Sequence, residues 1–67
     1  MVERQELREL RERRIAAGLS QRAVAERAGI AASNYSAIET GMRGASAEMI
    51  RRLEEALHAA IAANPQG

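Results

Sequence analysis

Apolar residues recur at helical spacing in four segments of the chain, and glycine and serine residues lie between these segments. Residues 2–17 contain neither glycine nor proline, and Leu7, Leu10 and Ala17 fall on one face of the amphipathic helix that this spacing predicts. Residues 21–28 predict a second, shorter helix in the same way. The first half of the chain is therefore expected to be helical.

Two further helices are predicted in the second half of the chain. Tyr35, Ile38 and Glu39 share one side of a short helix over residues 32–40. The last helix begins after Ser46 and continues to about residue 63. Its apolar stripe consists of Met49, Ile50, Leu53, Leu57, Ala60 and Ile61.

The residues between the segments are typical of helix ends. Gly18, Gly29 and Gly41 follow the first three helices, at positions where a helix commonly ends in a left-handed residue. Ser20 and Ser46 precede the second and fourth helices, where a serine hydroxyl can accept a hydrogen bond from a free backbone N–H group. These positions predict where the helices begin and end.

The composition favours one small all-α domain. All ten basic residues among the 67 are Arg, all nine acidic residues are Glu, and there is no Cys to form a disulfide or a thiolate zinc site. A chain this short buries only roughly 60% of its unfolded surface, so its core is thin. We predict a compact bundle of four to five helices with a central helix-turn-helix. It forms a single domain over residues 1–63, followed by a short polar tail over residues 64–67, where Pro65 disfavours helix.

The sequence offers little material for catalysis. His58 is the only histidine and the chain has no Asp, Lys or Cys, so neither a catalytic triad nor a phosphate-binding lysine loop can be assembled. Glu54 and His58 could supply only two metal ligands, and a surface ion pair is the simpler interpretation. We expect no enzyme activity, no cofactor and no metal. No apolar run approaches the roughly 20 residues that span a bilayer, so we expect a cytoplasmic protein without a membrane partner.

Two short helices joined through a glycine-centred turn and flanked by longer helices describe a helix-turn-helix unit. The run from Gly18 to Ile30 resembles the lambda-repressor-like, Cro-type helix-turn-helix family in its Leu-Ser-Gln start, its Ala at the helix contact and its Gly at the turn. The Glu-x-Gly sequence at residues 39–41 also stands at the family spacing, and the resemblance covers roughly residues 7–57. It implies a transcription regulator that binds an operator in double-stranded DNA.

The resemblance also implies roles for individual residues. Gln21 would meet a DNA phosphate and buttress the recognition helix, while Arg22 and Arg43 would neutralise phosphates. It implies that Ala32, Ser33 and Ala37 read base edges in the major groove. Asn34 and Thr40 would lie nearer the DNA backbone.

Base reading is expected to be sparse, because many relatives carry Gln, Arg or Lys where this chain has alanine, which can contact only a thymine methyl group. Three explanations remain open. In the first, methyl contacts together with hydrogen bonds from Ser33, Asn34 and Ser36 are enough for sequence specificity. In the second, DNA shape supplies the specificity. In the third, base reading has been lost and the surface binds a protein.

Two charged residues fall on apolar faces of their helices. Arg14 follows Leu10 by four residues, and Glu39 follows Tyr35 by four. Opposite charges in such places predict a mutual, partly buried ion pair. The family resemblance implies the same pair. By contrast, Arg8 and Glu12 are expected to pair on the solvent side of the first helix.

The net charge of +1 is too small to indicate a nucleic-acid partner by itself, so the placement of the arginines decides. Arg22 and Arg43 are favoured for phosphate contact, whereas Arg11 and Arg27 are expected on solvated faces, which leaves few phosphate contacts for one subunit. A monomer should therefore bind DNA weakly, and family members commonly bind as two-fold dimers on half-sites roughly 34 Å apart. The last helix offers a surface for self-association at Leu57, Ala60 and Ile61, although Ile61 could instead cap the monomer core.

The expected function is that of a homodimeric repressor, acting on its own gene, of phage or mobile-element type. Two alternatives remain open: a restriction-modification controller or antitoxin-type repressor with a protein partner, and a protein-interaction module that has lost base readout.

Overall fold

The computed structural model describes residues 2–63 of the chain, and the side chains of residues 5–63. Between residues 2 and 63 the chain forms helices and no strand, so the predicted all-α class is confirmed. The predicted tail over residues 64–67 lies outside the described residues. The helices are α1 (Val2–Ala16), α2 (Gln21–Ala28), α3 (Ala32–Glu39) and α4 (Ala47–Ala63).

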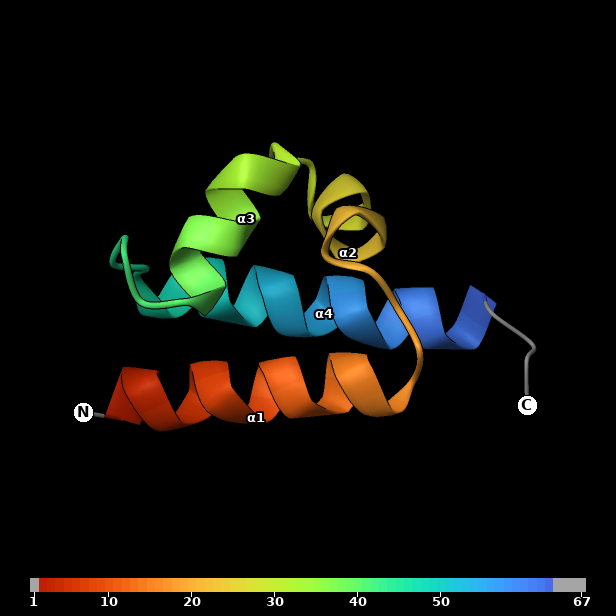
Figure 1. The fold of residues 1–67 in the computed structure, drawn as a ribbon, viewed down its shortest axis with the longest axis horizontal. Coiled ribbons are helices and arrows are strands. Elements are labelled where there is room, and N and C mark those ends of the chain that lie inside the picture. The colour runs from red at the N-terminus through yellow and green to blue at the C-terminus, as the bar shows by residue number, and fades with distance from the viewer. Residues whose placement is uncertain (1, 64–67) are drawn as a thin grey trace.

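The two long helices form a base on which the two short helices lie. In Figure 1, α1 and α4 run side by side in the same direction, and both end at the same end of the molecule. Helix α2 packs against α4 and α3, and α3 also contacts α1. The helix-turn-helix pair α2–α3 therefore sits on the opposite side of α4 from α1 in this view (Figure 1). Among residues 2–63, no helix has both the length and the apolar character needed to cross a bilayer.

The helix ends follow the predicted capping residues. The Ser20 hydroxyl accepts a hydrogen bond of 3.0 Å from the Ala23 N–H group, and Ser46 does the same at the start of α4, at 3.1 Å. Gly29 ends α2 in the left-handed region with φ +77°, which glycine adopts without steric cost. The predicted boundaries are thus confirmed to within one residue. The difference is that α1 and α3 each end one residue earlier than expected.

The core lies where the four helices meet, with Tyr35 as its largest fully buried side chain. Leu10 contributes from α1 and Val24 from α2, while Leu53 and Leu57 contribute from α4. All five are at most 1% exposed. Each helix supplies at least one of these side chains, so the four helices share one core, in which α3 contacts α1 and α2.

Candidate nucleic-acid interface

Helix α3 turns one face to solvent and the other into the core. Tyr35, Ile38 and Glu39 are buried, whereas the residues predicted to meet DNA lie on the other side. Of these, Ala32, Ser33 and Thr40 are exposed, and Asn34, Ser36 and Ala37 are partly exposed. Since Glu39 is the one charged residue of α3 and is buried, the solvent face of this helix is uncharged.

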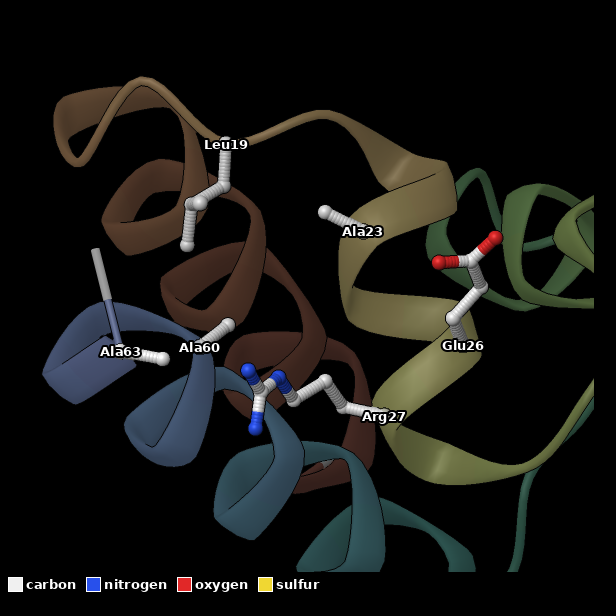
Figure 2. A pocket seen from close by; sticks show the side chains of 6 residues that line it. All are labelled: Leu19, Ala23, Glu26, Arg27, Ala60 and Ala63. Atoms are coloured by element: carbon white, nitrogen blue, oxygen red, sulfur yellow. The ribbon is translucent and has the colours of Figure 1, made fainter.

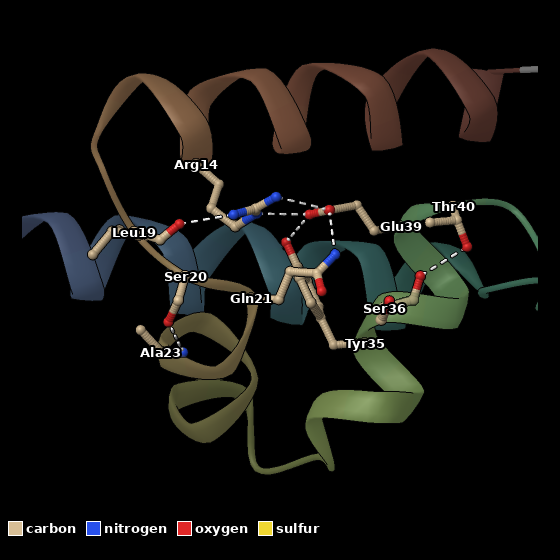
Figure 3. A network of polar contacts seen from close by, with 9 residues as sticks. All are labelled: Arg14, Leu19, Ser20, Gln21, Ala23, Tyr35, Ser36, Glu39 and Thr40. Carbon is tan, nitrogen blue, oxygen red and sulfur yellow. Dashed lines mark hydrogen bonds and ion pairs between the residues drawn. The ribbon is translucent and has the colours of Figure 1, made fainter.

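The ion pair expected between Arg14 and Glu39 is present, and it is the centre of a larger network (Figure 3). Arg14 donates from Nε to Glu39 Oε2 at 2.9 Å and from Nη2 to Oε1 at 3.0 Å. Its third nitrogen, Nη1, donates to the Leu19 carbonyl at 2.7 Å. The Glu39 side chain is 0% exposed and that of Arg14 is 11% exposed, so the pair is shielded from water and ties α1 to both α3 and the loop before α2.

Two further donors complete the coordination of the Glu39 carboxylate. The Tyr35 hydroxyl donates to Oε2 at 2.6 Å, and Gln21 Nε2 donates to Oε1 at 2.9 Å. Each carboxylate oxygen therefore accepts two hydrogen bonds. An ionised carboxylate suits this site, because it is an acceptor at all its lone pairs.

The network shifts the titration of its members. Burial by itself raises the pKa of Glu39, but the hydrogen bonds from Arg14, Tyr35 and Gln21 and the charge of Arg14 outweigh it and lower the pKa. Burial, with the hydrogen bond to the Glu39 carboxylate, raises the pKa of the Tyr35 hydroxyl. The hydrogen bond to Glu39 likewise raises the pKa of Arg14. The ionised Glu39 and neutral Tyr35 that the geometry requires are thus the stable forms at neutral pH.

The sequence predicted the Arg14–Glu39 pair of this network and a buttressing role for Gln21, but not the hydrogen bond from Tyr35. Tyr35 was expected only as a core residue, although its spacing of four residues from Glu39 on one helix is a usable signal for contact. Gln21 was expected to meet a phosphate and to buttress α3. The structure accounts for the buttress, because the side-chain amide is directed at Glu39, while the phosphate contact stays a prediction.

Two of the arginines predicted to contact DNA flank α3 in the sequence: one precedes the helix and the other follows it. Arg22 is highly exposed and pairs with Glu26 at 3.3 Å on the same helix. Arg43 donates from Nη1 to Asn34 Oδ1 at 2.7 Å. This contact draws the loop after α3 back over its first turn, so Asn34 and Arg43 are held together at the predicted interface.

A groove of about 570 Å³ lies between the C-terminal end of α4 and one side of α2, together with Leu19 of the loop before α2 (Figure 2). Figure 2 shows the Arg27 side chain extending from α2 toward α4. The lining residues are Leu19, Ala23, Glu26, Arg27, Ala60 and Ala63.

The structure corrects the expected self-association surface near this groove. Leu57 is fully buried in the monomer core, so it has no surface left for a second copy. Ala60 is 5% exposed, which limits it to the floor of the groove. Ile61 remains available at 38% exposed, and Ile15, which the sequence did not single out, is 54% exposed near the end of α1.

A second groove, of about 400 Å³, separates α1 from the C-terminal end of α3. It is lined by Leu7, Arg8, Arg11, Glu39, Thr40 and Gly41. The ion pair expected between Arg8 and Glu12 beside this groove is not formed: among the described side chains, the charged pairs in contact are Arg14–Glu39 and Arg22–Glu26. The expectation failed because both side chains are exposed, and solvent competes with such a pair.

The comparisons with known proteins agree with this architecture. A family model described as helix-turn-helix matches residues 10–62, which span most of the chain and all of α2 and α3. The comparisons with curated proteins and with solved structures give no match.

Proposed function

The chain belongs to the lambda-repressor-like, Cro-type helix-turn-helix family of DNA-binding transcription regulators, and from this premise we propose that it is a homodimeric repressor of the phage or mobile-element type. Each protomer places α3 in the major groove of an operator half-site. The bound dimer then excludes RNA polymerase from the promoter, including that of its own gene.

The observation that carries this proposal is the burial of Glu39, the one carboxylate of α3. A carboxylate on the solvent face of a recognition helix would repel the DNA phosphates, yet Glu39 is buried and accepts four hydrogen bonds. The face that remains offers small side chains, hydroxyl groups and one amide. This uncharged face lets the helix approach the base edges closely, with the exposed Arg22 of α2 and Arg43 of the loop after α3 as the proposed sources of positive charge.

Base recognition by this face relies on small groups. Ala32 and Ala37 can contact thymine methyl groups, and the hydroxyl of Ser33 can donate to or accept from a base edge. Ser36 and Asn34 add polar groups nearby, although Asn34 Oδ1 already accepts from Arg43. We therefore propose that direct readout is combined with recognition of DNA shape.

Dimerisation is proposed through the end of the molecule where α1 and α4 both end (Figure 1). Ile15 and Ile61 expose apolar surface there, and the adjacent groove has Glu26 and Arg27 among its lining residues. A two-fold interface brings the same patch of both copies together, so each copy can set its Arg27 against the Glu26 of the other. The proposed occupant of this end is thus a second copy of the chain.

The test is a binding titration at several salt concentrations, with DNA from upstream of the gene that encodes the protein and a duplex of random sequence as control. We expect tighter binding to the upstream DNA and two protomers per site. Absence of binding to either duplex at low salt would overturn the proposal and favour a protein-interaction module.

A further inference from the structure

The groove between α1 and the C-terminal end of α3 has no part in the contacts proposed so far. Leu7, Arg8 and Arg11 of α1 form one wall, and Glu39 at the end of α3 forms the other, together with Thr40 and Gly41 of the turn that follows it. Thr40 belongs both to this groove and to the exposed face of α3. The groove therefore opens beside the surface that is proposed to face DNA.

The charge of this groove is positive and not neutralised. Arg8 and Arg11 are exposed and lie three residues apart on α1, where side chains are neighbours. Neither forms an ion pair with any side chain that the structure describes. Glu39 also lines the groove, but its carboxylate is fully paired with Arg14 and its other donors. Among the side chains that the structure describes, these two guanidinium groups therefore have no paired counter-charge, and an anion placed between them would relieve their repulsion.

The position of the groove indicates which anion is within reach. A helix in the major groove, which is about 12 Å wide, has a sugar-phosphate backbone on each side. Packed helices lie about 8–10 Å apart, so a helix packed beside the recognition helix is at the distance of one backbone. Helix α1 contacts α3, and its residues Arg8 and Arg11 line the same groove as Thr40, which is also exposed at the proposed DNA-facing surface. Guanidinium groups also match the geometry of phosphate oxygens with two parallel N–H donors.

We propose that this groove binds a phosphate of the DNA backbone, with Arg8 and Arg11 as its donors. The proposal rests on the proposed function and extends the interface from α2 and α3 to α1. It assigns a role to Arg11, which the sequence alone placed on a solvated face. These contacts do not read sequence, so they raise the affinity for operator and for random DNA alike.

The experiment measures the salt dependence of binding by fluorescence anisotropy, using a labelled duplex of random sequence, for which binding is almost wholly electrostatic. Each phosphate contact contributes about 0.9 to the slope of log affinity against log salt concentration. The double substitution Arg8→Gln and Arg11→Gln removes both donors to this phosphate and is therefore expected to reduce the slope by about 0.9. Between about 50 and 200 mM salt, the loss of affinity then becomes about 3.5-fold smaller than in the wild type.

The matched control is the double substitution Arg51→Gln and Arg52→Gln, since both arginines are also exposed but lie on α4 and line neither groove. It removes the same charge and is expected to leave the slope unchanged, as is Arg11→Lys, which keeps the charge in the groove. If the double substitution in the groove changes the slope no more than the double substitution on α4, this inference is wrong although the proposed function stands. Failure of the wild-type protein to bind any duplex at low salt overturns both.

Discussion

Replacement of Glu39 by glutamine tests whether the buried network holds the recognition helix in place. The substitution preserves the size of the side chain but removes its charge and turns one acceptor oxygen into an NH₂ group. Four donor groups surround this side chain, from Arg14, Tyr35 and Gln21. Glutamine has one acceptor oxygen for them, so donors would face donors and the guanidinium group of Arg14 would lose its counter-charge.

The expected cost follows from the burial of the pair. Removal of one partner from a buried ion pair costs about 3–5 kcal/mol, because the other charge is left uncompensated. The lower figure applies here, since Arg14 keeps its hydrogen bond to the Leu19 carbonyl and glutamine still offers one acceptor. A loss of about 3 kcal/mol in the free energy of unfolding lowers the Tm of a domain of this size by roughly 12–24 °C.

Thermal unfolding followed by circular dichroism measures this effect, and Glu26→Gln is the matched control. Glu26 also pairs with an arginine, but the two side chains of that pair are 68% and 80% exposed. An exposed pair contributes less than about 1 kcal/mol, so this variant should melt within a few degrees of the wild type. Similar Tm values for the Glu39 and Glu26 variants would show that the buried pair does not stabilise the fold.

Three further predictions concern pH, the turn and self-association. Despite burial, the pKa of Glu39 lies below its ordinary 4.5, so its ionised form stabilises the fold above that pH. The difference in unfolding free energy between wild type and Glu39→Gln should therefore shrink as the pH falls below about 4.5. A difference that stays constant in acid would contradict this. Gly29→Ala should cost about 1 kcal/mol in denaturant unfolding, because an added Cβ meets no atom within 4 Å and only the positive φ is strained, whereas Gly44→Ala, which also has open space and no positive φ, should be neutral. Ile61→Glu should give monomers in sedimentation experiments and weaker DNA binding, while Ala59→Glu, at another exposed position of α4, should leave the dimer intact; a dimer that survives Ile61→Glu would indicate another interface.

The fold was predictable because its signals are local. Ser20 and Ser46 lie next to the helices that they cap, and Gly29 lies directly after the helix that it ends, so each can be recognised within a few residues. The apolar stripe of α4 predicted its buried face in the same way. The stripe could not show how far along α4 the side chains are buried within a single chain. Leu57 was assigned to a dimer surface because periodicity does not distinguish burial within one chain from burial between two chains.

The candidate site was only partly predictable, since its contacts join residues that are distant in sequence. The Arg14–Glu39 pair spans 25 residues, and it was found because two charges on apolar faces need partners. Gln21 lies 18 residues from Glu39 and is polar at a helix start, which is an ordinary place for it, so only the family resemblance indicated that it buttresses α3, and nothing identified Glu39 as its partner. Grooves depend on the packing of whole helices, and the position of Arg11 beside Thr40 is therefore a property of the fold alone.

The same network that fixes α3 also limits which arginines can bind DNA. Of the five N–H donors of Arg14, the structure uses three, for Glu39 and for the Leu19 carbonyl, and the side chain is 11% exposed. A phosphate would have to compete with these contacts, so Arg14 contributes to binding mainly by holding α3 in place. We propose that the positive charge for the phosphates comes from exposed arginines around the site. Arg22 and Arg43 are two candidates, and the groove lined by Thr40 offers Arg8 and Arg11 as two more, so in this proposal a chain with a net charge of only +1 presents a basic rim around an uncharged recognition face.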